Sequence, residues 1–355
     1  MTGPGAELAR RYHAELVGPL LSERWPGLRY AAGRLGGGSD VLGLDDDMSA
    51  DHDWGLRLTL LVEPELVNEV DAYLADRLPC EFAGRPTRFT LTQDPVVRHR
   101  VEVSGVDDFV ASRLGASEVV PARPVDWLTL VGQSVLEVTA GPVFVDSHGG
   151  LTRIRSSLAW YPNDTWWYTV AAGWGQVSEE LPLVGRTGWR GDEPGSQIIA
   201  GRLARTLIHL GFLLERRWSP YPKWLGTLFA ELPGARRAEP ALREALAARA
   251  WRDREEALCR AVEALYCLHL EAGLPGPDMP LEPYWDRPFR GLRPAVQQSL
   301  HDGILDPEVR RLPAGIGSVE QWVGNPAVLA SSRTRAATQA AYRAMMGAAD
   351  PVRRG

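Results

Sequence analysis

The strongest constraint on the fold is an apolar stripe near the middle of the chain. Between Gln197 and Trp218, apolar residues recur every three or four positions, at Ile199, Leu203, Leu207, Leu210 and Leu214. This spacing places them along one face of a single α-helix. A long amphipathic helix is stable only when other elements cover its apolar face. The second half of the chain must therefore supply helices that pack against it.

Helical spacing also occurs on both sides of this stripe. It begins near Asn163 and returns in Ala241–Leu270 and Thr334–Met346, while the Pro- and Gly-rich stretch Gly273–Pro294 is expected to be a long connection. We therefore predict a mainly helical domain over residues 163–349, followed by a loose tail at 350–355.

The first 140 residues have a different pattern, in which short apolar runs alternate with helical spacing. The expected elements are a helix at Ala6–Glu23, a short mixed segment at Leu28–Leu35, a strand within Asp53–Val62, a helix at Pro64–Leu78, a strand at Val96–Val103 and a helix at Asp107–Leu114. This order predicts a mixed sheet with helices over 1–140, and hence an α+β protein. Residues 141–162 are expected to form a connector with a hairpin at Pro142–Arg155, in which His148 is a turn residue.

Composition narrows the class of protein further. With 355 residues, 45% hydrophobic and 24% charged, the chain is typical of a globular protein of two or three domains. Its net charge of −6 argues against nucleic acid as a partner. No signal-peptide core and no apolar run of about 18 residues is present, so we expect a cytoplasmic protein without membrane contact. The three cysteines, Cys80, Cys259 and Cys267, lack metal-ligand spacing and are expected to be small buried apolar side chains without disulfides.

The most informative stretch for chemistry is Gly37–Gly43 with Ser49–Trp54 after it. Gly38 lets backbone approach a phosphate closely, and Ser39 offers a hydroxyl and can cap a following helix whose amides favour an anion. Asp51 and Asp53 are two residues apart, so on a strand both carboxylates would face the same side and share magnesium ions. Triphosphate chemistry needs these two functions side by side.

A Gly-Ser pair followed after about ten residues by Asp-x-Asp resembles the nucleotidyltransferase superfamily, which includes the aminoglycoside and lincosamide nucleotidyltransferases. Gly43 and Ser49 match further parts of that pattern. The resemblance implies that Asp51 and Asp53 bind two Mg²⁺ ions, and that Gly38 and Ser39 bind the nucleoside triphosphate.

The same resemblance implies a third acidic residue on a later strand, which serves as metal ligand and as base. Glu102 is the candidate, and its alternative is an exposed strand residue paired with Arg100. The chain departs from the superfamily at His52 and Trp54, because the residue between the aspartates is usually apolar. His52 is expected to be structural.

A second informative region comprises Val184–Gly188, Gly191–Ser196 and Pro220–Gly226. These segments resemble an uncharacterised bacterial family within the nucleotidyltransferase superfamily, over about residues 30–270, in which a helical domain follows the N-terminal module.

In that region we expect Arg186 on a flexible glycine-rich loop, with Ser196 as the N-cap of the next helix, so that the guanidinium can bind a phosphate. Lys223, the only lysine, lies in a Pro-rich turn beside Trp224. The alternative for both is a structural helix junction, in which Lys223 pairs with a carboxylate such as Glu215.

Three hypotheses follow from the sequence. The first is an enzyme that transfers a nucleoside monophosphate, AMP for preference, from a nucleoside triphosphate to a hydroxyl of a small molecule, with an acceptor pocket shaped by the helical half. The second is a catalytically weak nucleotide-binding protein of the same fold. The third is an enzyme that modifies tRNA or a toxin protein, and the acidic net charge counts against the RNA version.

Overall fold

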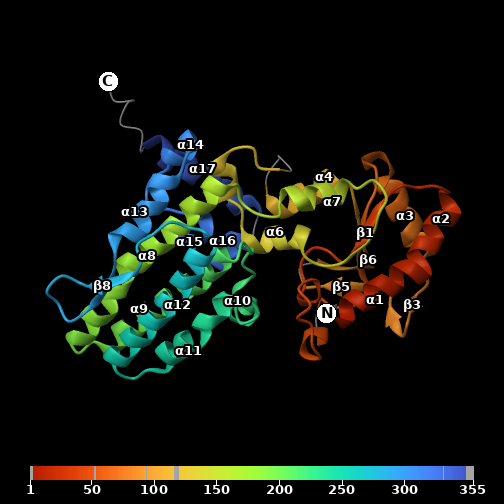
Figure 1. Ribbon diagram of the computed structural model, residues 1–355. Helices are drawn as coiled ribbons and strands as arrows, with labels where there is room; N and C mark the ends of the chain where they lie inside the picture. Colours follow the sequence, from red (N-terminus) through yellow and green to blue (C-terminus); the bar gives the residue numbers. More distant parts are fainter. Residues whose placement is uncertain (1–2, 52, 93, 116–119, 331, 349–355) are drawn as a thin grey trace. The chain divides into compact units, whose positions relative to one another are not determined.

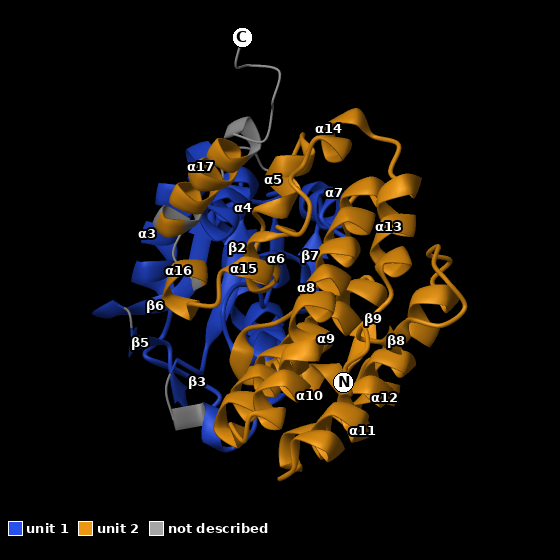
Figure 2. Ribbon diagram, turned by 90° about the vertical axis from the view of Figure 1, so that its left-hand side faces the viewer, with its two compact units in different colours: residues 1–120, 134–159 blue, residues 121–133, 160–355 orange. Residues whose placement is uncertain are grey.

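The computed structural model describes residues 3–51, 53–92, 94–115, 120–330 and 332–348, and it forms two units. Unit 1 comprises residues 1–120 and 134–159, and unit 2 comprises residues 121–133 and 160–355 (Figure 2). Unit 1 holds a mixed sheet with helices, whereas unit 2 is mainly helical. The predicted α+β class is thus confirmed.

The sheet of unit 1 has five strands in the order β5-β6-β2-β1-β7. Their bounds are Ala31–Gly33 (β1), Arg57–Leu61 (β2), Arg88–Leu91 (β5), Asp94–Ser104 (β6) and Val143–Asp146 (β7). Strands β2 and β6 are parallel, and the other neighbours are antiparallel. The register places Thr59 between Gly33 and Glu102, in one row across the sheet.

Alternation along β2 separates a core face from a polar face. Leu58 and Leu60 are buried in a cluster with Val101 of β6, Tyr12 of α1 (Pro4–Tyr12) and Val70 of α3 (Val67–Arg77). Successive side chains of a strand point to opposite faces, and paired residues share a face. Arg57, Thr59 and Glu102 therefore lie on the face opposite this core.

The helices of unit 1 follow the predicted order. Helix α1 continues through a π-helical turn at His13–Val17 into α2 (Gly18–Arg24), and a 3-10 turn at Pro64–Leu66 precedes α3. The remaining elements are the short strands β3 (Glu81–Phe82) and β4 (Arg85–Pro86), and the helices α4 (Val106–Leu114), α6 (Gly132–Thr139) and α7 (Gly150–Ser157).

The hairpin expected at Pro142–Arg155 is wrong. Strand β7 forms there, but its partner is β1, and α7 occupies the place of the second arm. His148 does lie in the turn between β7 and α7, where its Nε2 is 3.0 Å from the carbonyl oxygen of Arg29.

Unit 2 is built around α8 (Asn163–Trp189) and α9 (Glu193–Leu214), which pack along each other and against α12 (Trp251–Glu271) (Figure 1). The stretch expected to be a bare connection contains a small hairpin of β8 (Leu281–Pro283) and β9 (Arg290–Leu292). The other elements are α5 (Pro124–Leu128), α10 (Pro222–Phe229), a 3-10 turn at Ala235–Ala238, α11 (Glu239–Ala247), α13 (Pro294–Gly303), α14 (Pro307–Arg310), α15 (Val319–Trp322), α16 (Pro326–Ala330) and α17 (Ser332–Ala348).

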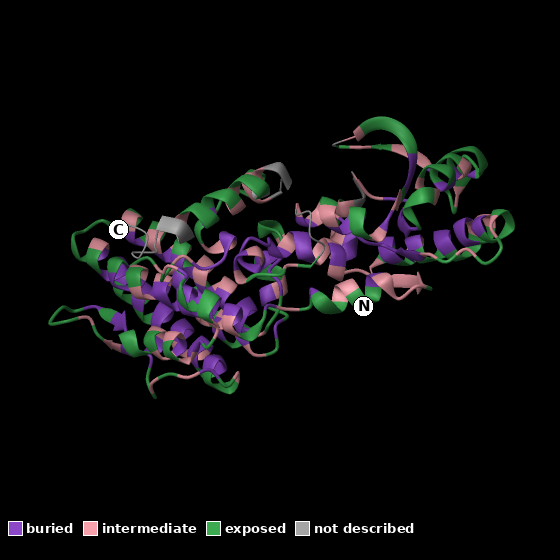
Figure 3. Ribbon diagram, turned by 90° about the horizontal axis from the view of Figure 1, so that it is seen from above, coloured by how far each residue is buried: buried purple, intermediate pink, exposed green. Residues whose placement is uncertain are grey.

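The predicted stripe of α9 is the centre of unit 2. Leu203, Leu207 and Leu210 are at most 1% exposed, and buried positions line the inner faces of the unit's helices (Figure 3). Within the described residues, α9 is the one helix long and apolar enough to cross a membrane. Its packing against α8 and α12 accounts for that apolar character, because a core helix has the same composition.

Candidate functional site

A buried ion pair supports the glycine loop that follows β1. Arg34 and Asp40 are 2% and 3% exposed, and the Arg34 Nε and Nη2 donate to the two Asp40 oxygens at 2.6 and 2.8 Å. Arg34 Nη2 also donates to the carbonyl oxygen of Gly37 at 2.9 Å. A bidentate pair of this kind fixes both partners. The loop Gly36–Gly38 is therefore built on a rigid support.

Gly38 occupies a place where no side chain fits. Its φ is 140°, and an added Cβ would lie 2.3 Å from Asp40 Oδ1, 2.5 Å from Arg34 Nη2 and 3.4 Å from Arg57 Nη1. Glycine at this position lets the backbone pass close to the Asp40 and Arg34 side chains, and the expected approach to a phosphate stays a prediction. The expected cap is different, because Gly38 itself is the N-cap and Ser39 begins a 3-10 turn of three residues, Ser39–Val41. So short a turn has no appreciable dipole.

The two aspartates do not lie on a strand, so the expectation that alternation places them on one face is wrong. Asp51 ends the 3-10 turn Met48–Asp51, and β2 begins only at Arg57. The side chain of Asp51 and the whole of His52 lie outside the described residues. Asp53 has a φ of 53°, a left-handed conformation that Asp tolerates better than most residues. Its Oδ1 accepts from the backbone N–H of Thr92 at 2.6 Å.

Glu102 lies on the polar face of β6 with 43% of its side chain exposed. Its partner is Arg113 of α4, whose Nη2 donates to Glu102 Oε2 at 2.6 Å. The expected alternative, a pair with Arg100, is not formed, because Arg100 donates to Asp94 Oδ2 at 2.7 Å. Arg113 also lies 3.9 Å from Glu137 of α6 and is held between two carboxylates.

Several of the predicted site residues lie near Arg57. Its Nη1 donates to the carbonyl oxygen of Asp53 at 2.9 Å and lies beside Gly38. Burial first, and then the neighbouring charge of Arg34, lower the pKa of Arg57 to about 10, while Asp40, Glu102 and Asp53 act in the opposite direction. The Gly-Ser loop, Asp53 and Glu102 thus all act on one guanidinium.

Sequence reasoning missed the three arginines of this site, namely Arg34, Arg57 and Arg113. Two of them had a local signal. Arg34 lies two residues before the glycine cluster, and Arg57 lies between Leu56 and Leu58 in a largely apolar segment. A charged residue within such a strand indicates a position where the sheet face is used for something other than packing. Arg113 had no such signal, since it lies at the end of an ordinary amphipathic helix.

Magnesium suits the predicted donor set, since carboxylate oxygens are the ligands that hard cations prefer. Glu102 offers a carboxylate on the exposed polar face, and Asp53 Oδ1 already holds the loop in place. Among the described residues, no three His, Cys, Asp or Glu side chains lie together as a metal site needs. The side chain of the third expected ligand, Asp51, lies outside the described residues.

Unit 2 places Arg186 on a helix, so the predicted flexible loop is wrong. Arg186 is exposed on α8, which continues to Trp189. An added Cβ at Gly188 would lie 2.2 Å from Trp251, and one at Gly185 would lie 2.6 Å from Phe289. These glycines let α8 approach its neighbours closely, and they do not confer mobility.

The predicted N-cap of α9 is also different. Asp192 is the N-cap and accepts from the N–H of Gly195 at 2.9 Å. Ser196 is fully buried, where its Oγ accepts from Arg254 Nη1 at 2.7 Å.

Lys223 lies in the first turn of α10, with its Nζ 4.7 Å from the ring centre of Trp224. The expected aromatic neighbour is present. The alternative pair with Glu215 is not formed, because Glu215 Oε1 accepts from the N–H groups of Gly234 and Ala235. Lys223 and Arg186 both belong to unit 2, and their role toward a phosphate stays a prediction.

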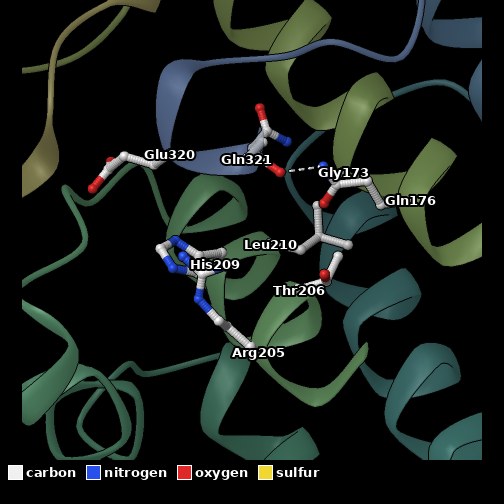
Figure 4. Close-up of a pocket in the computed structure, with 8 residues that line it drawn as sticks. All are labelled: Gly173, Gln176, Arg205, Thr206, His209, Leu210, Glu320 and Gln321. Atoms are coloured by element: carbon white, nitrogen blue, oxygen red, sulfur yellow. Dashed lines mark hydrogen bonds between the residues drawn. The ribbon is translucent and has the colours of Figure 1, made fainter. Parts of the chain in front are cut away.

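Unit 2 also contains a polar pocket between α8, α9 and α15 (Figure 4). Arg205 and His209 project from successive turns of α9, and Glu320 comes from α15. Burial raises the pKa of Glu320 to about 7 and lowers the pKa of His209 to about 3. Glu320 Oε2 accepts from the N–H of Gly132 at 3.0 Å.

Comparisons with known proteins add limited information. A family model described as a domain of unknown function (DUF4037) matches residues 127–225, which is less than half of the chain. No curated protein matches. One solved structure, of a nucleotidyltransferase-like protein from Exiguobacterium sibiricum 255-15, is similar at 12% identity and a TM-score of 0.33, over 76% of this chain and 77% of that chain. This is a weak nucleotidyltransferase-like similarity, and no function follows from it.

Proposed function

We propose that the protein transfers a nucleoside monophosphate from a nucleoside triphosphate to a hydroxyl of a small molecule. AMP is the nucleoside monophosphate that we propose. The observation that supports this most is the convergence on Arg57. The glycine loop, Asp53 and Glu102 come from three separate segments, and all three lie near one guanidinium on the polar face of the sheet. A transferase of this kind needs a phosphate cradle beside a group of carboxylates.

In the proposed reaction, the acceptor oxygen forms a bond to the α-phosphorus while the bond from that phosphorus to pyrophosphate breaks. Gly38 and Ser39 hold the phosphates, and Arg186 and Lys223 would neutralise charge on the leaving pyrophosphate. Asp51, Asp53 and Glu102 would hold two magnesium ions, which supply electrostatic stabilisation of the phosphates when bound.

The proton of the acceptor hydroxyl would pass to the Glu102 carboxylate. Glu102 is paired with Arg113, whose guanidinium occupies the carboxylate oxygens that would accept the proton. Arg113 must therefore leave Glu102 before transfer, and Glu137 is a second carboxylate within 3.9 Å of it. The acceptor would be bound by unit 2, the helical half to which the sequence assigns it.

Asp53→Asn tests the proposal. We expect magnesium-dependent pyrophosphate release from ATP, measured with a panel of hydroxylated acceptors, to fall below detection, because the variant loses a carboxylate from the phosphate site. The melting temperature should stay nearly the same, since an Asn oxygen can still accept from the Thr92 N–H.

The matched control is Asp46→Asn. Asp46 is exposed in the same loop, and its Oδ1 accepts from the N–H of Ser49, as an Asn oxygen also can. Full activity in Asp46→Asn and none in Asp53→Asn supports the site. Undiminished pyrophosphate release in Asp53→Asn would place the chemistry elsewhere.

One observation favours a second candidate, a nucleotide-binding protein with little turnover. The Arg113 pair occupies Glu102, and Asp53 lies in a turn instead of on a strand. Such a protein would bind magnesium and nucleotide in calorimetry but release no pyrophosphate with any acceptor.

A further inference from the structure

Arg57 has no direct ion-pair partner among the described residues, although carboxylates lie in its neighbourhood. Its guanidinium is only partly exposed, and its one hydrogen bond goes to a neutral group, the Asp53 carbonyl. Within the described part of the chain, no carboxylate lies within ion-pair distance of Arg57. The nearby Arg34, in contrast, forms a bidentate ion pair with Asp40. A guanidinium removed from water without a carboxylate partner is costly. Perturbed charged groups cluster at functional sites, where a bound anion can supply the missing charge.

The glycine loop passes close to Arg57 and to a second arginine. The place of a Cβ at Gly38 lies 3.4 Å from Arg57 Nη1, and the place of a Cβ at Gly36 lies 3.3 Å from Arg113 Nη2. The backbone at the two glycines thus passes close to two guanidinium groups along one loop. Both are planar donors that match the oxygens of a phosphate.

We propose that Arg57 is a phosphate-binding residue, which with Arg113 holds a diphosphate or triphosphate chain against the Gly36–Gly38 loop. This assignment deepens the proposed function and gives the loop its cations from unit 1 itself. When phosphate binds, Arg113 exchanges the Glu102 carboxylate for a phosphate oxygen. Arg57 needs no exchange, because its remaining donors have no charged partner among the described residues.

The alternative is that Arg57 is a structural residue that ties the Asp53 turn to β2. The two roles predict opposite effects on stability. Burial disfavours the charged form of Arg57 and lowers its pKa, so a neutral residue there should leave the fold as stable or more stable. A structural role requires the reverse.

The experiment is calorimetric titration of the full chain with inorganic pyrophosphate in the presence of MgCl₂, and with inorganic phosphate as the second arm. Arg57→Gln should weaken pyrophosphate binding at least tenfold with an unchanged or raised melting temperature. Arg57→Lys keeps the positive charge but loses the planar guanidinium, which can donate two parallel hydrogen bonds to a phosphate. We expect an intermediate loss of pyrophosphate affinity. The matched control is Arg98→Gln, because Arg98 is 63% exposed on the neighbouring strand β6 and pairs with Asp94.

Pyrophosphate bound well above phosphate, and lost in the Arg57 variants alone, supports the assignment. It is overturned by any of three results. These are no pyrophosphate binding by the wild type, binding by Arg57→Gln or Arg57→Lys within twofold of the wild type, and equal losses in Arg57→Gln and Arg98→Gln. If pyrophosphate binds through Arg57 but no acceptor is ever modified, the phosphate site stands and the proposed transfer reaction fails.

Discussion

Replacing Glu320 by Gln should stabilise unit 2, and the gain should depend on pH. In the folded protein the pKa of Glu320 is raised by burial from 4.5 to about 7. The folded state therefore holds this proton more tightly than the unfolded chain. Stability from this group is complete below pH 4.5, falls as the pH rises through the interval to about 7, and is constant above it. Gln resembles the protonated form at every pH.

The size of the effect follows from the same shift. A rise from 4.5 to about 7, at ~1.4 kcal/mol for each pKa unit, gives a ceiling of about 3 kcal/mol at pH 8. At pH 5, close to the ordinary pKa of 4.5, the Glu320 carboxyl of the unfolded chain is only partly ionised. About three quarters of the stability gain expected at pH 8 should therefore be absent at pH 5. The hydrogen bond from the Gly132 N–H survives, because a Gln oxygen can accept it.

Thermal unfolding followed by tryptophan fluorescence measures this difference. Trp25 and Trp54 are in unit 1 and the other 11 of the 13 tryptophans are in unit 2, so the signal reports mainly on the unit that contains Glu320. The control is Glu231→Gln, at an exposed position of the same unit, which should change the melting temperature little at either pH. A melting temperature for Glu320→Gln that is raised equally at pH 5 and pH 8, or lowered at pH 8, would refute the reasoning.

Two further changes test the packing of unit 2. Gly188→Ala should destabilise by about 1–3 kcal/mol in thermal unfolding, because its Cβ would lie 2.2 Å from Trp251, whereas Gly201→Ala on α9 meets nothing within 4 Å and should stabilise by up to ~1 kcal/mol. Equal effects would mean that α8 does not need its glycine. Arg254→Met should cost about 3 kcal/mol in denaturant unfolding, because the side chain is 1% exposed and donates to Ser196 and the Ala248 carbonyl, while Arg260→Met, 42% exposed on the same helix, should cost little.

The long elements could be predicted from the sequence because their signal is repeated along the chain. The α9 stripe and the helical spacing of α12 each extend over several turns, so a single exception does not change the period. The apolar residues of β2 predict a strand within Asp53–Val62, but they do not show that it begins only at Arg57. Element ends depend on local turns, which leave no periodic signal.

Glycine was the main source of error, because its meaning depends on what surrounds it. Gly185 and Gly188 suggested a loop, although in the structure they are helical positions with no room for a Cβ. Gly149 and Gly150 suggested a hairpin turn, although Gly149 is the N-cap of α7. A missing side chain permits either a turn or a close contact, and only the tertiary partner decides between them.

A sequence motif shows where the candidate site lies, but it does not show which of the site's side chains are paired with arginines. The Gly-Ser and Asp-x-Asp pattern marks the loop, yet Glu102 carries no mark of its pairing with Arg113, which comes from a helix eleven residues later. On the proposed function, a cation arriving at Glu102 weakens that pair, and a phosphate arriving at Arg113 weakens it equally. Each ligand removes the partner that the other must displace, so magnesium and phosphate should favour one another's binding. A paired Glu102 is then the expected condition of a site that binds its two charged ligands together, and it does not by itself indicate a site that has lost its chemistry.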